Sequence, residues 1–167
     1  MNALRSEQSR HLLQREPGSA ILSALNQLLE NDSYLLQVDA NERSITHRLA
    51  MYLQCELRDW HVDCEYNRNG EVSKCLMDEP ADSTDGSLVY PDIIVHRRGQ
   101  HLQSPCNYLV VEAKKDTSAR SASDDIDKLS RFQRDPRYRY QYALFIEFST
   151  TPPGVLRLEW IDAAIDN

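Results

Sequence analysis

The chain has 167 residues, of which 41% are hydrophobic and 27% charged, and its formal net charge is −7 at pH 7. This length suits one domain, residues 1–167, that can bury a core, and the composition is typical of a globular protein. The negative charge argues against a protein that coats nucleic acid non-specifically, but not against a nucleic-acid enzyme whose positive charge is local.

The sequence shows no sign of a targeting segment or a membrane span. Residues 1–18 are polar and charged, unlike a secretory signal. No apolar run approaches the roughly 20 residues that a membrane-spanning helix needs. The cysteines are widely spaced without a CxxC pair, which favours reduced thiols over disulfides. We therefore expect a cytoplasmic protein that does not contact membranes.

The first part of the chain is predicted to be mostly helical. Residues 1–18 are expected to be a loosely attached leader, after which Ser19 can cap a helix with apolar residues at helical spacing. A second helix is expected from a cap at Asn41 to about Leu57. Residues 60–66 alternate between polar and apolar types, which predicts a strand.

The middle of the chain changes from polar to strongly apolar. Residues 67–87 are polar and contain two glycines and a proline, which indicates a long hairpin connection or a surface insertion. Two runs rich in β-branched and aliphatic residues follow, at about 88–95 and 107–114. Both are predicted to be strands.

The last part is predicted to contain one helix and a hairpin. Ser123 can cap a short helix, and Asp124 and Asp125 in its first turn would interact favourably with the helix dipole. Strands are expected at 140–148 and 155–161, on either side of a TTPPG turn. This order of helices and strands predicts an α/β domain with a mixed sheet.

Charged residues interrupt the two central strands. If these strands form an antiparallel hairpin centred near Leu102, Asp92 lies opposite Glu112, with Cβ atoms roughly 4.5–5.5 Å apart. Side chains alternate along a strand, so Glu112 and Lys114 share a face while Ala113 points away. The hairpin would thus bring two carboxylates and an amine together.

Two carboxylates this close repel each other unless one is protonated or a cation lies between them. Carboxylate oxygens suit Mg²⁺ or Mn²⁺, and the lack of His or Cys nearby argues against zinc. With Lys114 to orient or deprotonate a water on the metal, Asp92 and Glu112 would suit phosphodiester hydrolysis. Glu42 shares the apolar, inward-facing stripe of its helix and is a candidate third carboxylate.

A basic segment follows the second of these strands. From Lys114 to Arg139 there are eight basic and five acidic residues, a local net charge of +3. A solvated helix face would explain this equally well, and each feature of the carboxylate group is, alone, more often structural. Their combination favours a functional site, with Lys115, Lys128 and Arg131 as candidates for contacting phosphates.

The stretch YPDIIVHRRG followed by YLVVEAKK resembles the PD-(D/E)xK nuclease superfamily, with Pro91-Asp92 and Glu112-Ala113-Lys114 as the signature. The expected order of elements over about residues 38–150 is also similar to that family's core. NERSITHRLAMYL resembles its first core helix, whose glutamate, here Glu42, often joins the metal site. The resemblance implies a restriction-endonuclease-like core with a mixed central sheet flanked by helices. It does not account for residues 1–36, 67–87 and the last hairpin; we expect 1–36 to form an N-terminal helical extension and 151–167 a C-terminal hairpin strand.

We therefore expect a Mg²⁺- or Mn²⁺-dependent nuclease that hydrolyses nucleic acid, with DNA favoured over RNA. Asp92, Glu112 and Glu42 would bind the metal, and Lys114 would act on the attacking water. Cutting both strands of a duplex would favour a homodimer. One alternative is a catalytically silent module of the same fold that binds a protein partner. Another is a zinc-binding regulator that uses His61 and the cysteines Cys55, Cys64, Cys75 and Cys106.

Overall fold

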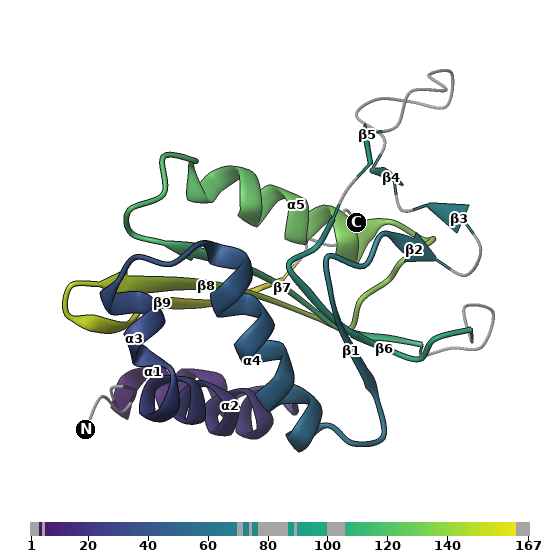
Figure 1. The fold of residues 1–167 in the computed structure, drawn as a ribbon. Helices are drawn as coiled ribbons and strands as arrows, with labels where there is room; N and C mark the ends of the chain where they lie inside the picture. Colours follow the sequence, from purple (N-terminus) through teal and green to yellow (C-terminus); the bar gives the residue numbers. More distant parts are fainter. Residues whose placement is uncertain are drawn as a thin grey trace.

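The computed structural model describes residue 4 and the ranges 6–69, 72–73, 75–76, 87–88, 90–99 and 106–162. Within these ranges, a mixed five-stranded sheet lies between two layers of helices (Figure 1). All neighbouring strands of this sheet are antiparallel except β7 and β8, which are parallel, so the predicted α/β class is confirmed. Across the sheet the strands are β1 (His61–Cys64), β6 (Ile93–His96), β7 (Asn107–Lys115), β8 (Tyr142–Thr150) and β9 (Pro153–Ile161).

The two faces of the sheet are covered by different helices (Figure 1). On one face, Leu129 of α5 packs in one buried cluster with Val110 of β7. On the other, Leu49 of α4 packs in a second cluster with Val111. The strand β7 is therefore buried on both sides. The described helices are α1 (Ser6–Leu12), α2 (Gly18–Asn31), α3 (Ser33–Gln37), α4 (Glu42–Glu56) and α5 (Ala122–Arg134).

The three predicted helices are confirmed, two of them with a correction at the N-terminal end. Asn41 caps α4 as expected, because its side chain accepts a hydrogen bond from the Ser44 backbone N–H at 2.9 Å. The helix expected to begin after Ser19 starts at Gly18 instead. The cap of α5 is Ser121, two residues before the predicted Ser123, since the Ser121 hydroxyl accepts from the N–H of Ser123.

The strand predicted at 88–95 is interrupted in the structure. Its regular part, β6, begins only at Ile93, while residues 87 and 88 form β5 (Ser87–Leu88), paired with β4 (Cys75–Leu76). Pro91 explains the break, since it has no N–H to donate to a sheet. The predicted insertion 67–87 also holds the short antiparallel pair β2 (Arg68–Asn69) and β3 (Val72–Ser73). Its remaining residues fall largely outside those described.

The predicted loose leader is wrong for residues 6–18, which pack against the domain. Leu12 of α1 is fully buried. Gln8 donates a hydrogen bond to the carbonyl of Val155, and the Trp160 indole N–H donates to the carbonyl of His11. Sequence periodicity missed this helix because α1 buries one residue of its own span. Among the described residues, no helix is long and apolar enough to cross a membrane.

Replacing Gly18 by alanine should destabilise the protein strongly. A Cβ atom at this position would lie 1.9 Å from the backbone oxygen of Leu12, so the turn between α1 and α2 would have to open. Overpacking of this kind typically costs about 1–3 kcal/mol of unfolding free energy. Thermal melts should show the loss, whereas Gly154→Ala, whose Cβ would meet its nearest such atom at 4.0 Å, should melt close to the wild type. Equal melting temperatures for the two variants would contradict this packing.

Candidate active site

A polar cleft opens at the C-terminal end of β7, between the first turns of α4 and α5, and has a volume of about 680 Å³. The signature residues of the sequence lie there, together with charged residues from four other segments. The lining residues are Glu42, Arg43, Glu65, Tyr90, Asp92, Glu112, Ala113, Lys114, Arg120, Asp125 and Lys128.

The register between β6 and β7 brings Asp92 to this cleft. Ile93 pairs with Val111, so one further step along both chains places Asp92 beside Glu112, as predicted. Although Asp92 precedes the strand, it is held in place, because its Oδ2 accepts a hydrogen bond from the backbone N–H of Ala113 at 2.8 Å. The predicted alternation also holds, with Ala113 packed in the cluster on the opposite face.

Glu112 is the most deeply buried acid of the cleft, with 3% of its surface exposed. Burial raises the pKa of its carboxyl well above the ordinary value, the negative charge of Asp92 raises it further, and Lys128 opposes both. The ammonium Nζ of Lys128 lies 2.8 Å from Glu112 Oε1, an ionic contact. This ammonium is the cationic partner of Oε1, and no further hydrogen-bond donor to this oxygen is found among the described residues.

Asp92 is subject to the same forces. Burial raises the pKa of its carboxyl to about 6, although the Ala113 N–H and Lys128 act in the opposite direction. Asp125 and Glu42 add to the increase through like-charge repulsion. Two neighbouring carboxylates with raised pKa values both favour uptake of a positive charge, either a proton or a cation.

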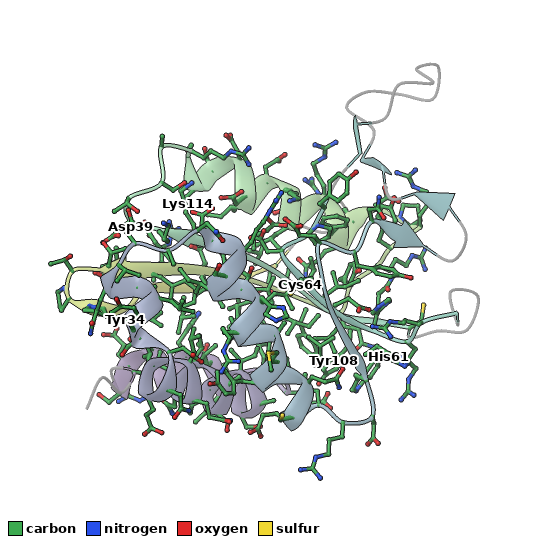
Figure 2. All side chains as sticks on the ribbon, viewed as in Figure 1. Tyr34, Asp39, His61, Cys64, Tyr108 and Lys114 are labelled. Atoms are coloured by element: carbon green, nitrogen blue, oxygen red, sulfur yellow. The ribbon has the colours of Figure 1, made fainter. Side chains whose placement is uncertain are left out.

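Lys114 is also buried, with 6% exposure, and faces the helix α5. Its Nζ lies 3.7 Å from Oδ2 of Asp125, and Figure 2 shows the residue between α5 and α4. Burial raises the pKa of Asp125, and Lys114 partly offsets this. On α5, Asp125 and Lys128 are three residues apart and so share a face. On this face, Asp125 lies against Lys114 of β7 and Lys128 lies against Glu112.

Glu42 lines the cleft, and its side chain is hydrogen-bonded to the backbone of β7. Its Oε1 accepts a hydrogen bond from the N–H of Lys115 at 3.1 Å. The Lys115 ammonium is bound to Oδ1 of Asp39 at 2.6 Å and to the carbonyl of Ala40 at 2.7 Å. Lys115 therefore fixes the turn before α4 to the end of β7, and its phosphate contact stays a prediction.

The other two predicted phosphate contacts differ in position. Lys128 lines the cleft, where its Nζ contacts Glu112 and also donates to the carbonyl of Tyr90 at 2.9 Å. Arg131 lies one turn further along α5, with its Nη1 3.9 Å from Oδ2 of Asp127, and it is not part of the cleft lining. The geometry thus favours Lys128 over Arg131 as a group that meets a ligand.

Sequence reasoning missed several residues of the cleft. Asp125 was interpreted only as an acid that interacts with the helix dipole. Its spacing of three residues from Lys128 was a usable signal, because it places both on one helical face. Tyr90, Arg43 and Arg120 come from separate segments, and no local pattern connects them.

The donor set of the cleft fits a hard divalent cation held by few protein ligands. In the part of the chain described, no three His, Cys, Asp or Glu side chains converge as a ready-made metal cage. Mg²⁺ commonly uses one or two carboxylates and keeps several waters. Asp92 and Glu112 provide that pair, and Glu112 Oε1 would share its charge between the ion and the Lys128 ammonium 2.8 Å away. Glu42 as a third ligand stays a prediction, since one of its oxygens already accepts from Lys115.

The zinc alternative gains no support from the described residues. Cys55, Cys64 and Cys106 are free thiols, and His61 lies on β1, outside the residues that line the cleft. The side chain of Cys75 is not among the described groups. In comparisons with known proteins, no family model, curated protein or solved structure matched the chain. The assignment of the site therefore depends on its own residues and geometry.

Proposed function

We propose that the protein is a Mg²⁺- or Mn²⁺-dependent nuclease that hydrolyses phosphodiester bonds in nucleic acid, with DNA favoured over RNA. One observation carries the proposal: a single cleft gathers the carboxylates of Asp92 and Glu112 beside the buried amine of Lys114. These groups come from strands paired in the register that the nuclease signature requires.

The proposed core is the restriction-endonuclease-like one. The order α4, β1, β6, β7, α5, β8 matches the order expected from the resemblance, with the three strands β1, β6 and β7 antiparallel. The signature residues lie at the end of the central strand β7, where α4 and α5 both contribute side chains.

Asp92 and Glu112 would hold the cation, with Glu42 beside them. When bound, such an ion would stabilise the negative charge that develops on the phosphate and acidify a water. Lys114 would hold the attacking water by hydrogen bonding, while Asp125 keeps its ammonium at the cleft wall. Lys128 is the candidate for contacting the phosphate.

A cleavage panel tests the proposal. Wild-type protein is incubated with single-stranded, double-stranded and branched DNA and with RNA, in Mg²⁺, Mn²⁺ or EDTA. We expect metal-dependent hydrolysis of at least one substrate. If no nucleic acid is cut with either metal, the catalytically silent binding module becomes the better interpretation, and purification of a bound protein partner is the next step.

Lys128 and Arg131 should differ in their effect on nucleic-acid binding. Each phosphate contact releases counterions, so losing one lowers the slope of log affinity against log salt by about 0.7–0.9. We expect this loss for Lys128→Met and an unchanged slope for Arg131→Met, measured by fluorescence anisotropy across a salt series. A reduced slope for Arg131→Met alone would place the phosphate path outside the cleft.

A further inference from the structure

Tyr90 stands out among the cleft residues because it is aromatic and exposed. The side chain is 46% exposed although the residue lines a cleft whose other members are mostly charged. It precedes Pro91, which is buried. Single exposed aromatic rings are common on protein surfaces, so the distinguishing feature of Tyr90 is its place at the rim of a charged cleft.

The backbone of Tyr90 is fixed to the candidate catalytic groups. Its carbonyl accepts a hydrogen bond from Lys128 Nζ at 2.9 Å, and the same ammonium contacts Glu112. A following proline restricts the preceding residue to extended conformations, so Pro91 limits the directions that Tyr90 can take. The ring is thus presented by a backbone held at a defined place beside Glu112.

The charges of the cleft do not favour binding to a duplex through many phosphate contacts. A protein that binds nucleic acid through about 6–10 phosphate contacts needs a similar number of available Lys or Arg side chains. The cleft holds four basic residues against five acids. Arg43 is paired with Glu65 and Lys114 with Asp125, so Lys128 and Arg120 are the two cations of the lining that we consider for phosphate contacts.

Stacking of bases supplies affinity without additional cations. A base that stacks on an aromatic side chain strengthens the binding of a single strand by roughly five- to 150-fold, and any base can do so. In the interior of an intact duplex both faces of each base are already stacked on neighbours. A ring at the cleft rim can therefore stack on an unpaired base but not on a base inside a duplex.

We infer that the cleft takes an unpaired nucleotide, whose base stacks on Tyr90 while its phosphate lies at Asp92 and Glu112. The inference rests on the proposed nuclease function and specifies its substrate class: single strands, or the single-stranded part of a branched or frayed end. Arg120, exposed at the same cleft, is placed to contact a neighbouring phosphate.

Fluorescence of 2-aminopurine tests the stacking. The probe is a 12-nucleotide DNA with one internal 2-aminopurine, used as a single strand, in a blunt duplex, and in a duplex with an unpaired extension that carries the probe. Binding is measured with Mg²⁺ in a Lys114→Ala background, which prevents turnover, combined with Tyr90→Ala, Tyr90→Phe or Tyr34→Ala. Tyr34 is a matched control, because it is a tyrosine with 69% exposure on α3, outside the cleft lining (Figure 2).

We expect the single strand and the extension to bind more tightly than the blunt duplex and to quench the probe. Tyr90→Ala should weaken single-strand binding about tenfold or more and remove the quenching. Tyr90→Phe, which keeps a ring, and Tyr34→Ala should match the background protein. Equal affinities for single strand and duplex, or equal binding by Tyr90→Ala and Tyr34→Ala, would overturn the inference.

The two proposals fail in different ways. If the wild type hydrolyses a nucleic acid with Mg²⁺ while Tyr90→Ala binds normally, the nuclease function stands and the stacking site is wrong. If the wild type neither binds nor hydrolyses any of the nucleic acids, both are wrong.

Discussion

Lys114→Ala should abolish hydrolysis while leaving the affinity for Mg²⁺ nearly unchanged. A side chain that acts on the proton of the attacking water contributes about 10²- to 10⁴-fold to the rate. The Lys114 ammonium pairs with Asp125 and is not one of the proposed metal ligands, so its removal takes away no metal ligand. Single-turnover rates at saturating protein measure the loss, and a Mg²⁺ titration followed by thermal melting measures the metal affinity.

Two controls accompany this variant. Alanine at position 114 leaves Asp125 without its partner, so Lys114→Ala with Asp125→Asn removes both charges and separates a loss of folding from a loss of chemistry. Arg131→Ala, on the same layer of the fold but outside the cleft, should retain its rate. Near-normal cleavage by a folded Lys114→Ala protein would remove Lys114 from the mechanism.

Asp92→Asn should make the metal-free protein more stable at pH 8 and remove most of its response to metal. The fold raises the pKa of Asp92 from 3.8 to about 6, so ionisation of this group destabilises the folded state. The unfolding free energy would rise by at most about 3 kcal/mol, since each pKa unit corresponds to about 1.4 kcal/mol. The amide oxygen of asparagine can still accept the N–H of Ala113.

The pH dependence follows from the direction of the shift. Because the folded-state pKa is higher than the unfolded one, the native protein binds the proton more tightly. The wild type therefore loses this contribution as the pH rises from about 4 through about 6. The stability difference between Asp92→Asn and wild type should be small at pH 4 and reach its full size above pH 7. Urea unfolding of both proteins across this range measures the difference directly. Acids that do not interact with Asp92 cancel, whereas Glu112, whose pKa the charge of Asp92 raises, contributes to the difference.

Metal addition completes the test of Asp92. By mass action, the wild type should gain about 2.7 kcal/mol in unfolding free energy when Mg²⁺ or Mn²⁺ is at a hundredfold excess over Kd. The variant should lose most of this gain. If Asp92 is instead a structural turn residue, the variant melts below the wild type and neither protein responds to metal. That outcome would contradict the metal-site assignment.

The features predicted best from the sequence depend on a local residue pattern or on the register of one antiparallel strand pair. The antiparallel register of β6 and β7 followed from one assumed centre and holds from Ile93 to Val95. The cap at Asn41 followed from residue type and the apolar pattern after it. The start of β6 was missed because Tyr90 and Pro91 extend an apolar run, and the missing N–H of proline was not given enough weight.

Contacts between distant segments could not be predicted. The bond between Lys115 and Asp39 joins residues 76 positions apart. This bond gives Lys115 a structural contact that the sequence did not predict. The pairing of Asp125 with Lys114 depends on how α5 lies over β7, which periodicity does not define. Such contacts are set by tertiary packing, and a single sequence carries no local signal for them.

The hydrogen bonds between α1 and β9 determine when, during synthesis of the chain, the fold can be completed. Gln8 and Val155 are 147 positions apart, and His11 and Trp160 are 149 apart. During synthesis, α1 can already pack against α2, but its hydrogen bonds to β9 can form only after the last strand of the sheet has emerged from the ribosome. Non-local contacts of this kind slow folding. The domain therefore completes its fold, including the docking of α1 on the sheet, only after β9 has been synthesised.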